Sequence, residues 1–382
     1  VWAVPVVVLA LLLLATIATA SILPSQLVAS KEVEQLGVEQ ETPYARTPAS
    51  ASPVGERLVI GDLSDVAEQF PSEGDIYFVT VTEPSQSILS WWVGRDHPAI
   101  QFLTRVEKFG VQTPQQRRRF AIESMRTSEQ VAQFVALQRL GFDVELTLGD
   151  VLISEFVCLE PSADGSECAV SSPSDDVLEP GDRILEVEGE EVDGVEDLAR
   201  ILEGLEPGDV VTMRIDRPEV GELEVDVELT VSPEDPDRTI VGFFPFDTRQ
   251  VCLPFELDID TGRIGGPSAG LAFTLTLIDE LTPGELTGGR RVAVTGTIQL
   301  DGSVGAIGGL RQKASAVAQT GLEVFLVPAA QGEADVEAAR EAGGDDVEII
   351  TVATLDEALE VLEDLGGDPI PPPPDAADDT DG

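Results

Sequence analysis

Residues 265–278 read Gly-Gly-Pro-Ser-Ala-Gly-Leu-Ala-Phe-Thr-Leu-Thr-Leu-Ile. After the glycine-rich turn only Thr274 and Thr276 interrupt an apolar run, which predicts a helix buried inside a domain. Ser268 lies where the turn becomes that helix, so we expect its hydroxyl beside free backbone N–H groups and the positive end of the helix dipole. Such N–H groups can hold an oxyanion. A serine that merely caps the helix is the alternative.

The chain offers few bases that could take a proton from Ser268. Its one histidine, His97, lies in the stretch Gly-Arg-Asp-His-Pro (94–98), which is typical of a polar surface turn and leaves a Ser-His-Asp triad without its base. A desolvated lysine can act instead, and only three of the 23 basic residues are Lys. Lys313 lies beside the apolar stripe of a helix predicted at about 310–319, so we expect its stem to point into the domain. A lysine whose ammonium reaches water is the alternative.

Residues 237–365 alternate between strand and helix patterns, which predicts an α/β domain. The predicted strands lie near 290–298, 324–327 and 347–352, and the predicted helices near 310–319, 334–342 and 355–365.

Four motifs of this region occur in a characteristic order. They are Gly-Pro-Ser-Ala-Gly (266–270), Val-Thr-Gly-Thr-Ile (294–298), Gly-x-Val-x-x-Ile-Gly-Gly-Leu-x-x-Lys (302–313) and Phe-Leu-Val-Pro (325–328). In order and spacing they resemble the proteolytic domain of Lon proteases. The resemblance implies that Ser268 is the nucleophile, Lys313 the general base and Thr295 a hydroxyl that helps to hold the lysine. Gly266, Pro267 and Ala269 would then shape the turn whose backbone N–H groups face the oxyanion.

Two features depart from that family. Many Lon enzymes carry an acidic residue three places before the serine, whereas this chain has Gly265. The 382 residues also contain no G-x-x-x-x-G-K-[ST] loop, so we expect an activity that does not use ATP within this chain.

Residues 146–232 are rich in short strands, with one helix predicted at about 195–202. The string Pro-Gly-Asp-x-Ile-Leu-x-Val-x-Gly (180–189) resembles a PDZ domain of the bacterial protease type. In that family a peptide carboxyl end adds to the sheet as a strand, and backbone N–H groups of the preceding loop hold its carboxylate. The resemblance places this loop at Leu148, Gly149, Asp150 and Val151. A spacer domain that binds nothing tightly is the alternative.

The composition excludes several classes of function. With 71 acidic and 23 basic side chains the formal net charge is −48, which rules out a basic nucleic-acid-binding surface. One histidine and three cysteines without a CxxC pair are too few for a zinc cluster, so neither a metal nor another cofactor is expected.

Residues 1–24 are predicted to be a membrane anchor. Val1 to Leu23 carry no charge, and about 20 apolar residues can cross a bilayer. Ala18-Thr19-Ala20 has the pattern of a cleavage site, which leaves a signal peptide as the alternative. In either case we expect the folded domains outside the cytoplasm, on a single-pass protein of the bacterial cell membrane.

The three cysteines are consistent with an oxidising location. Cys158 and Cys168 flank a short loop and are the natural disulfide pair. Cys252 is left over and is predicted to be a small buried hydrophobe.

The remaining segments complete the predicted domain order. Residues 25–58 are rich in Pro, Ser and Ala and suit a linker. Residues 59–145 are predicted to be a membrane-proximal α/β segment, with a helix capped near Thr127 or Ser128 and ended by Gly141. Residues 366–382 have the composition of a disordered acidic tail.

The sequence therefore predicts a multidomain α/β protein with an N-terminal apolar helix, a β-rich PDZ domain and an α/β Lon-type proteolytic domain. We expect a serine endopeptidase that hydrolyses unfolded or exposed protein segments recruited by the PDZ domain. By resemblance its subunits form a homo-oligomeric ring. The alternative is a PDZ scaffold at the membrane surface that is inactive or cleaves only itself.

Overall fold

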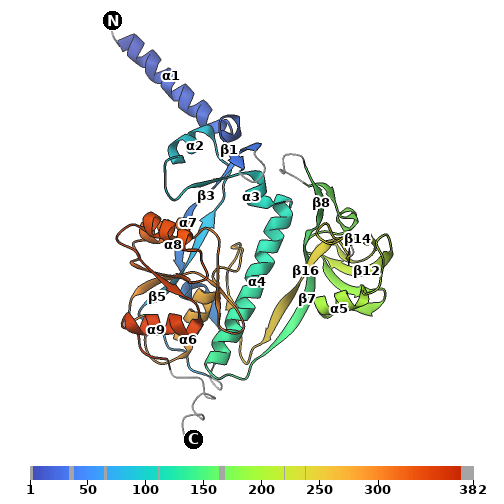
Figure 1. The fold of residues 1–382 in the computed structure, drawn as a ribbon. Helices are drawn as coiled ribbons and strands as arrows, with labels where there is room; N and C mark the ends of the chain where they lie inside the picture. The colour runs from blue at the N-terminus through green and yellow to red at the C-terminus, as the bar shows by residue number, and fades with distance from the viewer. Residues whose placement is uncertain are drawn as a thin grey trace.

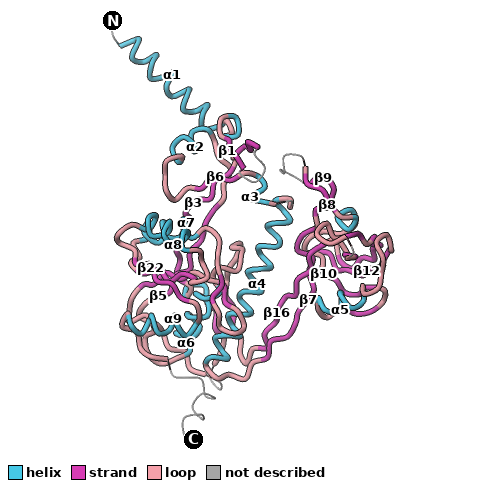
Figure 2. Tube along the Cα trace, viewed as in Figure 1, coloured by secondary structure: helices cyan, strands magenta, loops and turns pink. Residues whose placement is uncertain are grey.

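The computed structural model describes residues 3–33, 38–63, 67–110, 112–162, 168–218, 220–236 and 238–370. Two lobes flank the long helix α4 (Pro114–Arg139), as Figure 1 shows. The larger lobe combines helices with a central sheet, whereas strands dominate the smaller lobe (Figure 2).

A six-stranded sheet in the order β22-β21-β18-β5-β3-β6 forms the centre of the larger lobe. Its strands are β3 (Tyr44–Pro53), β5 (Asp75–Thr82), β6 (Gln101–Leu103), β18 (Arg291–Val294), β21 (Val324–Pro328) and β22 (Glu348–Val352). β5, β18, β21 and β22 pair in parallel, with Val292 beside both Ile76 and Val324. Every residue of β21 is buried, as expected of a parallel strand covered on both faces.

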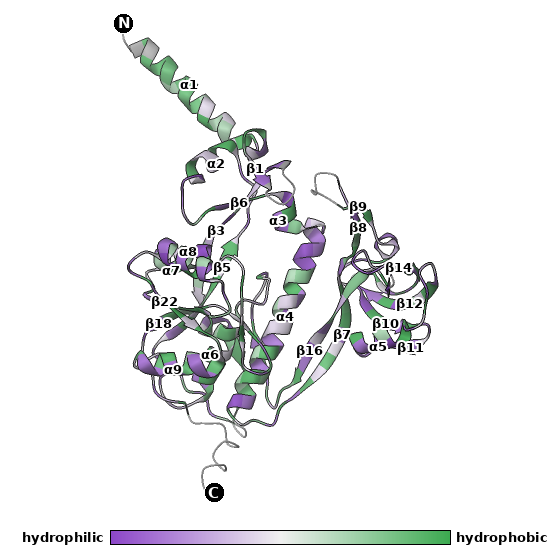
Figure 3. Cartoon of the chain, viewed as in Figure 1, coloured by the Kyte–Doolittle hydropathy of each residue, from purple (hydrophilic) through white to green (hydrophobic). Residues whose placement is uncertain are grey.

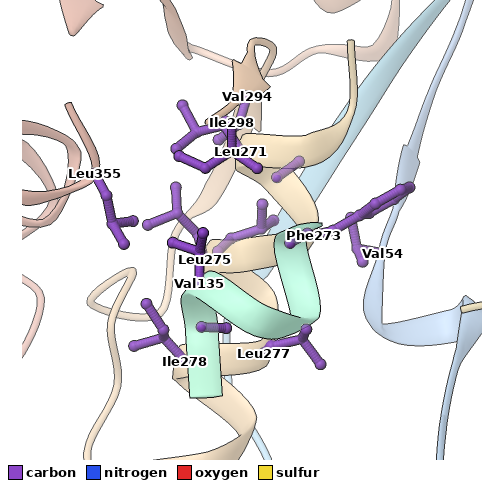
Figure 4. Packing of buried hydrophobic residues seen from close by; sticks show 14 of the residues in the cluster. Val54, Val135, Leu271, Phe273, Leu275, Leu277, Ile278, Val294, Ile298 and Leu355 are labelled. Carbon is purple, nitrogen blue, oxygen red and sulfur yellow. The ribbon is translucent and has the colours of Figure 1, made fainter. Parts of the chain in front are cut away.

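Helices cover both faces of this sheet. They are α6 (Gly270–Leu281), α7 (Leu310–Thr320), α8 (Glu333–Gly343) and α9 (Leu355–Asp364). α4, α6 and α9 share one apolar core with strand residues such as Val292, whereas α7 and α8 share the other with Ala293 and Phe325. Every residue of α6 except Glu280 is buried, which confirms the predicted buried helix. Figure 4 shows side chains on several sides of α6 packed among those of neighbouring elements.

The smaller lobe has its own sheet, in the order β13-β12-β10-β7-β16, and every strand pair in it is antiparallel. The strands are β7 (Glu145–Phe156), β10 (Arg183–Val187), β12 (Val210–Arg217), β13 (Gly221–Glu228) and β16 (Phe243–Cys252), with β11 (Glu190–Glu191) beside β10. Helix α5 (Val195–Ile201) covers it. A separate apolar cluster, which includes Ile153, Ile184 and Met213, fills this lobe.

The smaller lobe is an insertion in the larger one. β7 leaves the end of α4, β16 returns beside it, and Cys252 pairs with Glu145 at the base of this ribbon. The chain then forms β17 (Leu257–Ile259), which pairs with β4 (Leu58–Ile60) of the larger lobe. Two predicted boundaries are therefore wrong. Residues 243–252 belong to the sheet of the smaller lobe, and residues 59–145 supply β5, β6 and α4 to the larger lobe instead of forming a segment of their own.

The described residues of the predicted linker (25–58), which are 25–33 and 38–58, are also folded. β3 lies between β5 and β6 in the central sheet, with a register shift between Pro48 and Ala51. Such an irregularity is where a strand tolerates proline, so a Pro-rich composition misled the prediction. Before β3 come η1 (Ser25–Leu27), β1 (Ser30–Val33) and β2 (Val38–Glu41), and after it η2 (Gly55–Arg57).

Helix α4 begins earlier than the sequence analysis predicted. Its N-cap is Thr113, whose side chain accepts the N–H of Gln116 while the Gln116 side chain accepts the N–H of Thr113. Pro114 occupies the first helical position, where a missing N–H costs nothing. Thr127 and Ser128 therefore lie inside the helix and do not cap it.

The short elements complete the fold. They are α2 (Ile88–Gly94), α3 (Arg105–Phe109), η3 (Pro173–Asp176), β8 (Cys158–Pro161), β9 (Cys168–Ser171), β14 (Thr230–Val231), β15 (Thr239–Ile240), β19 (Thr297–Ile298) and β20 (Val304–Gly305).

The N-terminal helix α1 (Ala3–Ile22) projects from the larger lobe and is largely apolar (Figure 3). In the part of the chain that the structure describes, no helix is both long and apolar enough to span a bilayer, so the predicted membrane anchor is not confirmed. Of the predicted tail, 366–382, residues 371–382 lie outside the described residues.

The insertion yields a prediction about folding. Replacing residues 146–251 with Asn-Gly should leave the larger lobe folded, because Glu145 and Cys252 are paired and a two-residue turn closes such a pair. Circular dichroism should show one cooperative melt within about 10 °C of the parent protein. A variant that is unfolded at 25 °C would show that the larger lobe needs the smaller lobe in order to fold.

Candidate active site

The turn before α6 presents Ser268. Gly266 adopts φ +92°, a conformation that side-chain-bearing residues rarely take, and Ala269 is the N-cap of α6. Ser268 is half-buried and lies two residues before the first helical residue. The glycine-rich run thus turns the chain sharply enough to place a hydroxyl beside the start of a buried helix.

Helix α7 brings Lys313 to this hydroxyl. The helix begins at Leu310 after Gly309, whose left-handed backbone makes the turn into it. The Nζ of Lys313 lies 2.7 Å from the Oγ of Ser268 and 2.8 Å from the Oγ1 of Thr295. Only 2% of Lys313 is exposed, so its stem points into the domain as predicted.

Burial lowers the pKa of the Lys313 amine from 10.5 to about 7. The cause is desolvation, because removal from water disfavours the charged form of an amine. A large share of the amine is therefore uncharged at neutral pH, and an uncharged amine has the lone pair that a general base needs.

Thr295 fixes the geometry between the two side chains. It follows β18, and its backbone N–H donates to the carbonyl of Leu326 at 3.0 Å. Its hydroxyl donates to the backbone carbonyl of Ser268 at 3.0 Å, so its oxygen is left to accept a hydrogen bond from Lys313. The amine lone pair can then face the Ser268 hydroxyl.

The backbone around Ser268 supplies candidate oxyanion donors. Pro267 has no N–H, and the N–H of Gly266 donates to the carbonyl of Ala121 at 2.7 Å. Those of Ser268 and Ala269 have no acceptor among the described residues. These two groups, at the start of α6, are therefore available to a negatively charged oxygen.

The residues predicted to bind a peptide carboxylate lie elsewhere than expected. Leu148, Gly149, Asp150 and Val151 are within β7, where Val151 pairs with both Asp247 and Ile184. The four residues therefore belong to a strand and not to a loop that precedes one, so the predicted loop is wrong and peptide binding at these positions stays a prediction.

The structure shows a different groove on the smaller lobe. A cavity of about 880 Å³ lies between α5 and the start of β16. Its apolar lining includes Leu198 and Leu202 on the helix side and Val241, Phe243 and Pro245 on the strand side. Gly242, at φ +90°, turns the chain into β16. The run Val-Gly-Phe (241–243), which leads into β16, is the sequence signal that could have located this groove.

The other predicted residues are placed as follows. Cys158 and Cys168 form a disulfide that joins β8 to β9. Cys252 is exposed at the end of β16, so its predicted burial is wrong. His97 is exposed in the turn after α2, and its Nδ1 accepts the N–H of Ala99 at 3.1 Å. Among the residues that the structure describes, no three His, Cys, Asp or Glu side chains lie close enough together to hold a metal ion.

The fold and the site define a class. Residues 261–364 match the Lon protease (S16) C-terminal proteolytic domain, and residues 169–217 match a PDZ domain. The match to a Lon proteolytic domain supports a serine-type peptidase, here with a PDZ domain inserted in it.

Particular relatives agree with this class. The chain is 37% identical over 126 residues to the Lon protease of Clostridioides difficile, which covers 32% of this chain and 16% of that protein. It is 38% identical over 108 residues to the Lon protease of Trichlorobacter lovleyi, covering 28% of this chain and 13% of that protein. The chain thus spans under one fifth of the length of either relative.

Among solved structures, the chain is similar to the PDZ domain of an SdrC-like protein from Listeria monocytogenes. The identity is 20% and the TM-score 0.18, with 24% of this chain and 85% of that chain covered.

Location outside the cytoplasm and assembly into a ring stay predictions.

Burial of Lys313 yields a prediction about stability. Between pH 7 and 10.5 the unfolded chain binds more protons than the folded one, so wild-type stability rises with pH across this window. A Lys313→Met variant lacks this titration. The free energy of unfolding should therefore be higher in Lys313→Met than in wild type at pH 6. This excess should shrink by about 4 kcal/mol between pH 6 and pH 10.

Urea titrations at the two pH values measure this difference. Arg311→Met is the matched control, because Arg311 is exposed on the same helix and arginine keeps its charge throughout. A pH-independent effect of Lys313→Met would show that the folded state leaves the amine solvated.

Proposed function

We propose that the protein is a serine endopeptidase that works through a Ser268–Lys313 dyad. The observation that carries the proposal is the 2.7 Å contact between the Ser268 hydroxyl and a lysine amine that is only 2% exposed. A solvated lysine would stay protonated at neutral pH and could not take the serine proton.

In the proposed reaction the Ser268 Oγ attacks the carbonyl carbon of the scissile peptide bond while Lys313 takes the hydroxyl proton. The developing oxyanion accepts hydrogen bonds from the backbone N–H groups of Ser268 and Ala269. Lys313 then gives its proton to the leaving amine, and the C–N bond breaks. A water attacks the resulting ester with Lys313 again as base, which releases the acyl product and restores the Ser268 hydroxyl. Thr295 keeps the lysine in place throughout.

The proposed substrates are unfolded or exposed segments of proteins. The sequence carries no phosphate-binding loop of the Walker type, so we propose that cleavage by this chain does not require ATP. A segment that is already extended can enter the site without being unfolded first.

We also propose that the groove between α5 and β16 recruits the carboxyl end of the substrate. β16 pairs with β7 along one edge, and its other edge lies toward α5, so an added peptide strand would lie between strand and helix. Leu198, Phe243 and Pro245 suit apolar side chains near the peptide end. The rival function is a scaffold that binds peptides but cleaves nothing, or only itself.

The dyad predicts both the effect of substitution and the pH profile. Ser268→Ala and Lys313→Ala should each lower kcat/KM for a fluorogenic peptide by at least about 10³-fold. In the wild type, kcat/KM should rise with pH and reach half of its maximum near pH 7, because the buried amine loses its proton there. A fluorophosphonate probe should label wild type at Ser268 and leave Ser268→Ala unlabelled.

Ser124→Ala is the control for the loss of a hydroxyl, because Ser124 bonds within its own helix. Folded wild type that neither cleaves nor takes the probe between pH 6 and 9 would favour the scaffold. Retained turnover in Ser268→Ala or Lys313→Ala would exclude the dyad.

The groove yields a prediction about substrate preference. Ala199 is exposed on α5 and lines the cavity, so Ala199→Trp should obstruct it without disturbing the core. We expect KM for unfolded protein substrates to rise about 10-fold, the equivalent of 1.4 kcal/mol, while cleavage of tetrapeptides is unchanged. Glu196→Trp places the same side chain at an exposed position of the same helix outside the lining and should change neither. Equal KM values for both variants would argue against recruitment by this groove.

A further inference from the structure

Helix α4 contacts the turn that carries Ser268, although α4 lies outside the residues that match the Lon proteolytic domain. The carbonyl of Ala121 accepts the N–H of Gly266 at 2.7 Å, and the Oγ of Ser128 donates to the carbonyl of Pro267 at 3.0 Å. Two consecutive residues before the nucleophile are therefore held by one helix.

The fit between helix and turn is close. A Cβ on Gly265 would stand 2.8 Å from the Cβ of Ala121, and one on Gly270 would stand 2.8 Å from the Oγ of Ser128. Both distances are shorter than ordinary contacts, so glycine is required where α4 meets either end of the turn. α4 thus fixes where the turn lies.

Ser128 differs from the serine one turn earlier in how it uses its hydroxyl. Ser124 donates to the carbonyl of Phe120 in its own helix, the usual choice of a helical serine. Ser128 is only 6% exposed and donates across to Pro267, 139 residues away in the chain. Its hydrogen bond is therefore a tertiary one, made to the peptide group that leads into Ser268.

The geometry of a peptide group gives this bond a consequence. The described chain has no cis peptide bond, so the Pro267 carbonyl and the Ser268 N–H point in opposite directions from one rigid plane. The N–H of Gly270 also donates to this carbonyl, at 3.3 Å, and the shorter bond from Ser128 holds it on the α4 side. The Ser268 N–H is therefore turned away from α4. That N–H is one of the two groups assigned above to the oxyanion.

We propose that Ser128 is a positioning residue for catalysis, which orients the Ser268 N–H as an oxyanion donor by holding the Pro267 carbonyl. This inference rests on the proposed peptidase activity. Ser128 itself touches no substrate atom. Its contribution is to keep the 267–268 peptide plane from rotating, so that the donor needs no reorganisation when charge develops on the substrate.

The test uses the full chain and three variants. Ser128→Ala should lower kcat about 10-fold and leave KM unchanged, because loss of a whole oxyanion donor costs about 10²–10³-fold and here the donor remains but is less constrained. Its half-maximal pH should stay near 7, because Ser128 does not contact Lys313. The Ki of a peptide aldehyde, which forms a tetrahedral adduct with the serine, should rise in parallel with the fall in kcat. Ser124→Ala should match wild type in all four measurements.

A second substitution separates positioning from folding. Ser128→Thr keeps the hydroxyl but adds a methyl group at a buried site, so it should lower the melting temperature while kcat per folded, probe-titrated enzyme stays within about 3-fold of wild type. Should Ser128→Ala match wild type in kcat and Ki, or should kcat follow the melting temperature in both variants, the inference is overturned. Folded wild type that does not cleave or label would overturn the peptidase proposal and this inference together, which distinguishes the two failures.

Discussion

The candidate site depends on keeping one amine out of water. The pKa of Lys313 falls from 10.5 to about 7, which corresponds to a destabilisation of the ammonium form by about 5 kcal/mol. The surrounding packing has to offset this cost, and it does so with apolar groups: α6 is buried along almost its whole length, and Ala314, Ala316 and Val317 beside the lysine are fully or almost fully buried. Basicity of the lysine is thus a property of the whole core, because only a continuous apolar environment can exclude water from its amine.

The inserted lobe meets this core through α4. On one side the helix forms hydrogen bonds to the turn before Ser268, through Ala121 and Ser128. On the other side Phe120 packs edge-on against Phe246 of β16, with ring centroids 5.6 Å apart, and Arg119 reaches Glu179 at 3.4 Å. β16 is also the strand that lines the groove beside α5. A single helix therefore contacts both the groove strand and the turn that carries Ser268, so the two lobes share a structural element as well as a chain connection.

The pairing of Ser268 with Lys313 was predicted through the resemblance of four ordered motifs to the Lon proteolytic domain. The local patterns alone indicated a hydroxyl at the start of a buried helix and a lysine beside an apolar helical stripe, and each pattern left a structural alternative open. The split of the proteolytic lobe was missed because it depends on pairing between residues far apart, such as Glu145 with Cys252 and Leu58 with Ile259. The start of α4 was missed for another reason. Thr113-Pro114 is a helix-start signal, but the arginine run 117–119 interrupts the apolar stripe by which the predicted helix would have been extended back to Pro114.

The glycine at position 265, where this chain departs from the Lon pattern, has a structural cause. Many Lon enzymes carry an acidic residue at this position, three places before the serine. The structure gives a steric reason, since Ala121 of α4 occupies the space where any side chain at 265 would begin. The consequence is electrostatic as well. A carboxylate three residues from Ser268 would favour the ammonium form of Lys313 and raise its pKa, whereas here desolvation alone determines the shift. In a chain with a net charge of −48, the close contact of Ala121 with this turn thus excludes an acidic side chain at residue 265.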